Sequence, residues 1–160
     1  VTGVQTCALP ILLQNDVPGS YFLDLFAGSG QIGLEALSRG AQYAVFVDSG
    51  KKQASCIEEN IRFTKFDRQS RVYAADVLGA LRAMEGSYQF DLIFMDPPYG
   101  KKLEQEALCY LSRSSLLKED AQIIVETSLD TEFDYLEQYG LTLFKQKNYK
   151  TNTHAFIRRR

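Results

Sequence analysis

The sequence predicts an α/β fold in which helices cover a doubly wound, mostly parallel β-sheet that ends in an antiparallel hairpin. Short apolar runs alternate along the chain with stretches of helical period, which is the pattern of strand–helix–strand units. The apolar runs are hydrophobic almost throughout, as strands are when a parallel sheet is buried on both faces. The last 20 residues break the alternation with two strand-like runs close together.

The predicted core strands are short apolar runs rich in Val, Ile, Phe and Tyr. At this length, such composition favours strands over helices. In chain order the runs are YFLDLFA (21–27), YAVFVD (43–48), RVYAAD (71–76), FDLIFMD (90–96) and AQIIVET (121–127).

The stretches between these runs carry helical spacing. In the second stretch Ala54, Ile57 and Ile61 recur three or four residues apart, which places them on one face of a helix. The predicted helices are Gln31–Ser38, Lys51–Phe63, Val77–Met84 and Lys102–Leu111.

The carboxyl-terminal runs LTLFKQK (141–147) and THAFIRR (153–159) are separated by NYKTN (148–152). A connection this short joins antiparallel neighbours, because a parallel pair needs a longer crossover. The spacing therefore predicts a hairpin, and with it an antiparallel edge on the parallel sheet.

Length and composition restrict the class of protein. A chain of 160 residues suits one domain with a single core, and the formal net charge of −2 indicates no particular partner. No apolar run approaches the roughly 20 residues of a membrane span. The three cysteines lack CxxC spacing, which predicts reduced thiols in the cytoplasm and no metal site.

The first residues, VTGVQTCALPI (1–11), differ from the remainder. They lack an initiator Met and have neither the basic start nor the long apolar core of a signal peptide. They resemble translated adapter sequence. We therefore expect a non-native leader at 1–11 and one domain over 12–160.

A glycine turn follows the first predicted strand. Gly28, Gly30 and Gly33 satisfy GxGxxG between a strand and a helix, and Asp48 ends the next strand. This is the pattern of a dinucleotide site, although a lone GxGxxG is weak evidence, because a tight strand–helix turn also needs glycines.

Acidic residues at the strand ends separate the candidate cofactors. Asp24 lies four residues before Gly28. A carboxylate at this place would repel the pyrophosphate of a dinucleotide, whereas it would attract the cationic sulfonium and ammonium groups of S-adenosylmethionine. Asp48 can accept ribose hydroxyl hydrogens from either cofactor, and Asp76 is placed for the adenine amino group. The acids favour S-adenosylmethionine over NAD.

The motif DPPY (96–99) ends the fourth strand at the crevice of a doubly wound sheet. A following proline keeps Asp96 and Pro97 extended, and neither proline has an N–H to form a turn. The Asp96 carboxylate and the Pro97 carbonyl can then accept both hydrogens of an exocyclic amine. Tyr99 offers a ring on which a base can stack.

These motifs resemble those of a known family. FLDLFAGSGQIGLEALSRGA (22–41), VFVD (45–48), DLIFMDPPYG (91–100) and KNYKTNTHAFIRRR (147–160) are similar to bacterial 16S ribosomal RNA guanine-N2 methyltransferases of the guanine-966 type. The resemblance covers nearly all of residues 12–160. It implies a class I, Rossmann-like fold with seven strands, the last antiparallel.

The resemblance also implies roles for individual residues, a partner and a reaction. The partner is the 16S ribosomal RNA of an assembling small subunit, and the protein acts as a cytoplasmic monomer. The family carries a basic amino-terminal arm that is replaced here, so we expect weak activity on the ribosomal substrate. The implied cofactor residues are Asp24, Phe26, Gly28, Gly30, Asp48, Asp76 and Val77, and the implied catalytic residues are Asp96, Pro97, Pro98 and Tyr99.

Other functions stay open at this point. DPPY also occurs in enzymes that methylate the N6 amine of adenine in DNA or RNA. A NAD-dependent oxidoreductase and a truncated cofactor-binding fragment without activity are further alternatives.

Some residues are not assigned to the site. His154, the only histidine, lacks an acidic partner at motif spacing and is interpreted as structural. Lys145, Lys147, Lys150 and Arg158–Arg160 are expected to form one compact basic group.

Overall fold

The computed structural model describes residues 14–160, which form a single seven-stranded sheet in the order β3-β2-β1-β4-β5-β7-β6. The predicted leader at 1–11 and its junction at residue 12 lie outside the described residues. The strands are β1 (Tyr21–Leu25), β2 (Tyr43–Asp48), β3 (Ser70–Ala74), β4 (Phe90–Met95), β5 (Leu117–Ser128), β6 (Leu141–Asn148) and β7 (Asn152–Arg159).

The sheet is parallel from β3 to β5, and β7 runs antiparallel to both of its neighbours. The predicted fold class and the carboxyl-terminal hairpin are confirmed. The chain order reverses between β1 and β4, so the carboxyl ends of these two strands form the crevice where ligands bind in doubly wound sheets.

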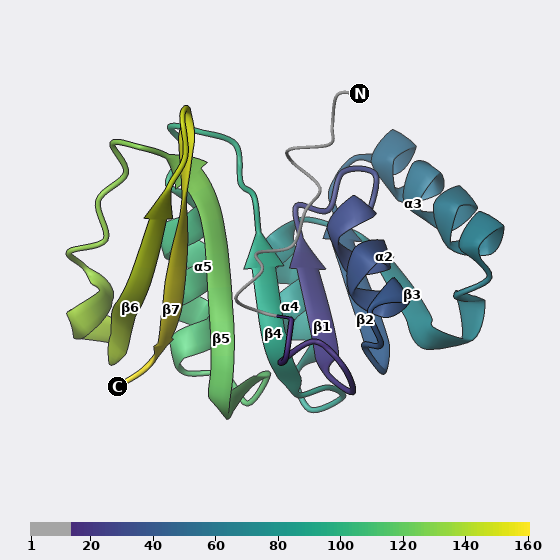
Figure 1. The fold of residues 1–160 in the computed structure, drawn as a ribbon, viewed down its shortest axis with the longest axis horizontal. Coiled ribbons are helices and arrows are strands. Elements are labelled where there is room, and N and C mark those ends of the chain that lie inside the picture. Colours follow the sequence, from purple (N-terminus) through teal and green to yellow (C-terminus); the bar gives the residue numbers. More distant parts are fainter. Residues whose placement is uncertain (1–13) are drawn as a thin grey trace.

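Helices cover both faces of the sheet (Figure 1). Buried side chains of α2 and α3 pack with Phe46 of β2 in one core cluster, and those of α4 and α5 pack with Val45 in the other. The two clusters alternate along each strand because successive side chains point to opposite faces. The helices are α2 (Gln31–Ser38), α3 (Lys51–Thr64), α4 (Val77–Met84) and α5 (Leu103–Ser112), with 3₁₀ turns η2 (Asp67–Gln69) and η3 (Leu136–Tyr139).

The third glycine of the turn has a packing role. A Cβ on Gly33 would lie 2.3 Å from a ring carbon of Phe46 in β2. Only glycine therefore lets α2 approach the sheet this closely, which fixes the start of the helix over the crevice.

The predicted compact basic group does not form. Lys147 and Lys150 lie at the β6–β7 hairpin tip, where Asn152 pairs with Ser128 at the carboxyl end of β5, and Lys145 lies further along β6, opposite Phe156. The three terminal arginines lie at the opposite end of β7, about 20 Å from the hairpin tip at the rise of a strand, and only Lys145, two register positions from Arg158, lies near them. Sequence proximity was misleading because an extended strand separates the two sets of charges.

Arg159 illustrates the structural use of these arginines. Its guanidinium donates hydrogen bonds to the carbonyl oxygens of Ser112, Ser114 and Leu117, at 2.6, 3.0 and 3.0 Å. This arginine ties β7 to the connection between α5 and β5.

Glu85 holds the end of α4 to the same connection. Its carboxylate accepts hydrogen bonds from the Tyr110 hydroxyl at 2.6 Å, the Ser115 hydroxyl at 2.6 Å and the Ser114 hydroxyl at 2.8 Å. The hydrogen bonds from Ser115 and Tyr110 lower the pKa of Glu85 from 4.5 to about 2.

This low pKa predicts a pH dependence of stability. The stabilisation from the Glu85 carboxylate is present above its unfolded pKa and is lost as pH falls from 4.5 toward about 2. In urea titrations, Glu85→Gln should therefore lose less unfolding free energy between neutral pH and about pH 3 than the wild type does. Glu59→Gln, on exposed α3 surface, is the matched control. Equal pH dependence in wild type and Glu85→Gln would contradict this role.

Candidate functional site

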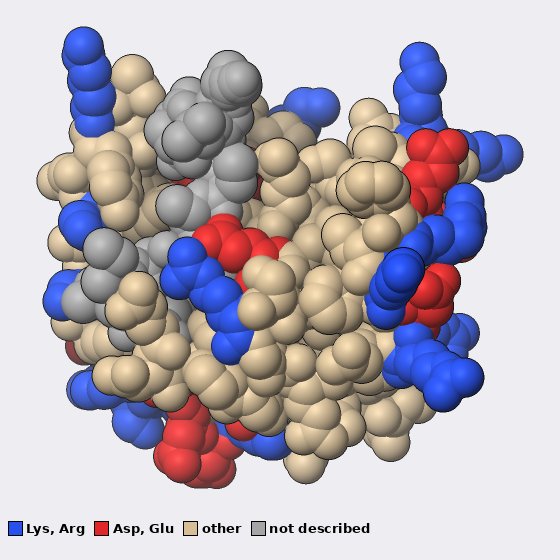
Figure 2. Space-filling view, turned by 45° about the vertical axis from the view of Figure 1, so that its right-hand side comes forward, with Lys and Arg blue, Asp and Glu red and all other residues tan. Residues whose placement is uncertain are grey.

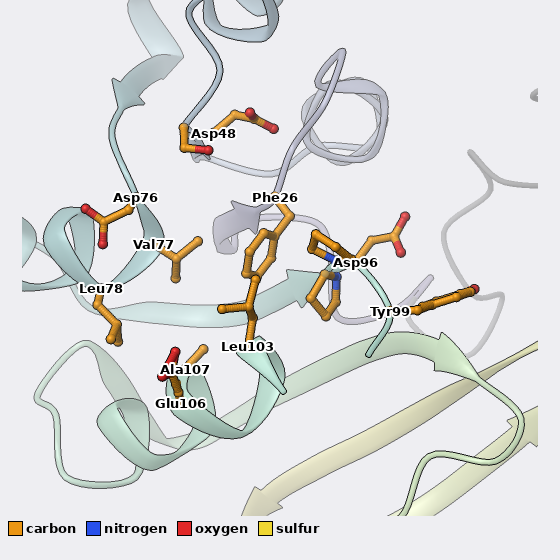
Figure 3. Close-up of a pocket in the computed structure, with 13 residues that line it drawn as sticks. Phe26, Asp48, Asp76, Val77, Leu78, Asp96, Tyr99, Leu103, Glu106 and Ala107 are labelled. Carbon is orange, nitrogen blue, oxygen red and sulfur yellow. The ribbon is translucent and has the colours of Figure 1, made fainter. Parts of the chain in front are cut away.

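A cavity of about 550 Å³ opens at the carboxyl ends of β1, β2 and β4. In Figure 3, Asp48, Asp76 and Val77 lie on one side of the Phe26 ring, and Asp96 and Tyr99 lie on the other. The lining residues are Phe26, Asp48, Ser49, Asp76, Val77, Leu78, Asp96, Pro97, Pro98, Tyr99, Leu103, Glu106 and Ala107. The structure thus brings eight of the predicted site residues together: Phe26, Asp48, Asp76, Val77, Asp96, Pro97, Pro98 and Tyr99.

Asp48 connects two loops, the glycine turn after β1 and the loop after β2, on the proposed cofactor side of the cavity. Its two carboxylate oxygens accept backbone N–H hydrogen bonds from Gly28 and Gly50, each at 2.9 Å. Each carboxylate oxygen has a second lone pair, so both can still accept a hydroxyl hydrogen. The predicted ribose contact is compatible with this arrangement.

Asp76 caps helix α4 and lines the same side. One of its carboxylate oxygens accepts the Gly79 N–H at 3.1 Å, as an N-cap side chain does. The cap fixes the side chain at the cavity rim, where its other oxygen can accept a hydrogen from an amino group.

Phe26 has a strained backbone. Its φ of 58° lies in the left-handed region, which bulky residues avoid. Such strain is concentrated at functional sites, and here it directs the ring between the two halves of the cavity (Figure 3). No local sequence pattern predicts this backbone conformation.

Asp24 lies beneath the glycine turn and does not line the cavity. It is 2% exposed, and its carboxylate accepts the Gly33 N–H in the first turn of α2 at 3.0 Å. Burial, together with the charges of Asp96 and Asp48, raises the pKa of Asp24 well above its usual range, against the effect of the Gly33 hydrogen bond. Gly28 and Gly30 also lie outside the lining, so the methionine contacts of these three residues stay a prediction.

Asp96 stands on the other side of Phe26, at the start of the DPPY loop. By surface area its side chain is exposed, but it forms part of the concave wall, where protein replaces some of its water. This desolvation and the charge of Glu126 raise the pKa of Asp96 to about 6, and His154 lowers it. Tyr99, which is 57% exposed, leaves its ring accessible to a base.

Helix α5 supplies residues that sequence reasoning missed. Glu106 and Ala107 follow Leu103 by three and four residues, so the three line the cavity with one face of the first helical turns. Their spacing predicts a helix, but it does not predict that this face of the helix lines the cavity. Ser49 and Leu78 were also missed, although each adjoins a predicted residue.

The donor pattern of the cavity fits S-adenosylmethionine better than a dinucleotide. A pyrophosphate over this turn would need backbone N–H groups from the turn and the start of α2. The Gly28 N–H is donated to Asp48 and the Gly33 N–H to Asp24, so carboxylates already occupy these donors. Of these two carboxylates, that of Asp48 lines the cavity and would attract a cationic group of S-adenosylmethionine.

Within residues 14–160, no group of three or more His, Cys, Asp or Glu side chains is arranged to hold an ion. In the same part of the chain, none of the helices is both long enough and apolar enough to cross a membrane.

Comparison with known proteins decides the family. The family model described as "Conserved hypothetical protein 95" matches residues 7–158.

The chain belongs to this family.

Two relatives of this chain have names that describe them as methyltransferases. The Bacillus subtilis protein "Putative rRNA methyltransferase YlbH" is 34% identical over 149 residues, which cover 89% of this chain and 80% of the relative. "Ribosomal RNA small subunit methyltransferase D" of Haemophilus influenzae is 36% identical over 126 residues, which cover 78% of this chain and 64% of the relative.

A solved structure agrees with the fold. The Haemophilus influenzae "putative methylase HI0767" superposes with a TM-score of 0.82 and 32% identity, covering 92% of this chain and 91% of that one. The predicted class I, Rossmann-like methyltransferase fold and the predicted cofactor, S-adenosylmethionine, are confirmed.

Proposed function

We propose that this protein transfers a methyl group from S-adenosylmethionine to the exocyclic N2 amine of a guanine in 16S ribosomal RNA. The observation that carries the proposal is the DPPY loop beside the cofactor cavity, with the Asp96 carboxylate in its wall. A relative named for the small-subunit ribosomal RNA, 36% identical to this chain, supports the choice of substrate.

Two carboxylates would hold the cofactor. Asp48 would accept the ribose hydroxyl hydrogens and Asp76 the adenine amino hydrogen. When bound, S-adenosylmethionine supplies a methyl group made electrophilic by its sulfonium. Apolar residues also line the cavity, as they commonly do in ligand sites; they include Phe26, Val77, Leu78, Leu103 and Ala107.

The DPPY loop would hold the guanine. The Asp96 carboxylate and the Pro97 carbonyl accept the two amine hydrogens, and Tyr99 stacks on the ring. Methylation replaces one N–H bond of the amine with an N–C bond, so one proton must leave. Asp96 is placed to accept it, and positioning and electrostatics supply most of the catalysis.

The hairpin tip is the proposed contact for RNA phosphates. Lys147 and Lys150 are exposed at the same edge of the sheet as the DPPY loop. On the face shown in Figure 2, Lys and Arg side chains lie in separate groups, some of them next to acidic ones. A base inside folded RNA must be unstacked to reach Asp96, and phosphate contacts around it would hold the strand.

Removal of two hairpin lysines should weaken RNA binding. For Lys147→Ala/Lys150→Ala we expect a higher KM for RNA and an unchanged affinity for S-adenosylmethionine. The slope of log K against log salt should fall by about 1.4, at about 0.7 for each single-strand phosphate contact. Arg62→Ala/Arg68→Ala, at the opposite edge of the sheet, removes the same charge and is the control. Equal salt slopes for the two double variants would exclude the hairpin from the interface.

A transfer assay tests the substrate class. Labelled S-adenosylmethionine is supplied with immature small subunits, mature small subunits or free DNA, and the label in nucleic acid is counted. We expect transfer to immature subunits, in keeping with a cytoplasmic monomer acting during assembly. Label in DNA would favour the adenine-N6 alternative, and cofactor binding without any transfer would favour an inactive fragment.

A further inference from the structure

Glu126 and His154 form a buried pair next to the DPPY loop. The two residues lie opposite each other on β5 and β7 and are 7% and 8% exposed. The His154 Nε2 lies 3.1 Å from the Glu126 Oε1, and the Asn152 Nδ2 donates to the Glu126 Oε2 at 2.9 Å. Both carboxylate oxygens are therefore engaged, which fixes the carboxylate in one orientation.

Strand register aligns this pair with Asp96. Met95 of β4 pairs with Val125 of β5, so Asp96 and Glu126 each follow a paired position on neighbouring strands. Neighbouring strands are about 4.8 Å apart. Glu126 in turn pairs with His154. The three titratable residues thus form a row across β4, β5 and β7 at the edge that bears the cavity.

The surroundings of the pair are aromatic. The His154 ring meets Phe94 edge-on at 6.3 Å and Tyr149 at 4.9 Å, measured between ring centroids. Among residues 14–160, the buried Nδ1 of His154 has no hydrogen-bond partner. Apolar surroundings strengthen electrostatic interactions, so the charge on Glu126 acts strongly on the Asp96 carboxyl group.

Among residues 14–160, two further titratable groups interact with Asp96. The Asp96 charge raises the pKa of Asp24 on β1 and that of Tyr99 in its own loop. Lys147 of β6 pairs with His154 in register, but its Nζ lies near the exposed Tyr149 ring, at 5.6 Å. The negative charge of Glu126 opposes ionisation of Asp96, and a protonated His154 favours it.

We propose that Glu126 and His154 are positioning residues that control the ionisation of Asp96 and thereby set the acid limit of methyl transfer. The inference rests on the proposed function, in which the Asp96 carboxylate accepts the proton that the amine loses as its N–C bond forms. A carboxylate that is more basic than an ordinary aspartate accepts that proton more readily. Asp96 then releases the proton to solvent, to which it is exposed.

Two substitutions that keep hydrogen-bonding groups test the pair. Glu126→Gln removes the negative charge and keeps an amide that can bond to Asn152 and His154. His154→Gln removes the group that can become cationic and keeps a donor for Glu126. In profiles of kcat/KM against pH, the acid limb should move to lower pH in Glu126→Gln and to higher pH in His154→Gln. Loss of packing alone would not produce shifts of opposite sign.

A measurement without RNA separates this inference from the proposed function. The ¹³C resonance of the Asp96 carboxyl, assigned by its loss in Asp96→Asn, is titrated in the wild type and in both variants. Opposite displacements of the midpoint support the coupling whether or not methyl transfer is detected. Unchanged midpoints in either folded variant would overturn it, even where the wild type methylates RNA.

Discussion

Replacement of Asp96 by alanine is expected to reduce methyl transfer by roughly 10²–10⁴-fold, the usual contribution of a positioned acid–base group. The substitution removes both an acceptor for the amine hydrogens and the group that takes the released proton. Affinity for S-adenosylmethionine should hardly change, because Asp96 stands across Phe26 from Asp48 and Asp76 (Figure 3). Single-turnover rates and calorimetric cofactor titration measure the two quantities.

Two further variants sharpen the Asp96 test. Asp96→Asn keeps one acceptor oxygen and loses the proton-accepting charge, so its rate should lie between those of wild type and Asp96→Ala. Asp120→Ala, an exposed position on β5, controls for loss of an acid. Near-normal transfer by Asp96→Ala would rule out the proposed role.

Replacement of Asp48 by alanine should have the largest effect on cofactor affinity. We expect S-adenosylmethionine binding to weaken by about 1–3 kcal/mol, as when a charged acceptor leaves its partners unpaired. Part of the loss arises because the Gly28 and Gly50 N–H groups lose their acceptor, which loosens both loops. Isothermal titration of the cofactor gives the value directly.

The Asp48 effect should be confined to the cofactor. Saturating S-adenosylmethionine should restore most of kcat, whereas it would not rescue Asp96→Ala. Asp67→Ala, in the exposed turn η2, is the matched control. If Asp48→Ala binds the cofactor as tightly as this control does, Asp48 is not a ribose ligand.

Strand and helix positions were predictable because their patterns are local. Helices α2 and α4 have the bounds that their spacing predicts, Gln31–Ser38 and Val77–Met84. The site was predictable for a related reason. Parallel strands end at one edge, so acids at successive strand ends, such as Asp48 and Asp76, must converge.

Other features depend on contacts between distant segments, which local pattern does not encode. The cavity wall from α5 depends on how that helix docks, and Asp24 turned out to serve the start of α2. His154 lacked an acidic partner at motif spacing, but Glu126 lies directly opposite it across two antiparallel strands. Only the register of β5 and β7 reveals that pair.

Identification of the methylated nucleoside tests the central claim most directly. Immature small subunits are incubated with the protein and with S-adenosylmethionine carrying an isotopically labelled methyl group. The RNA is then digested to nucleosides and analysed by mass spectrometry, with Asp96→Ala as the background. Labelled N2-methylguanosine is the expected product. Label in N6-methyladenosine, or no label above the Asp96→Ala background, would contradict methylation of a guanine amine by this site.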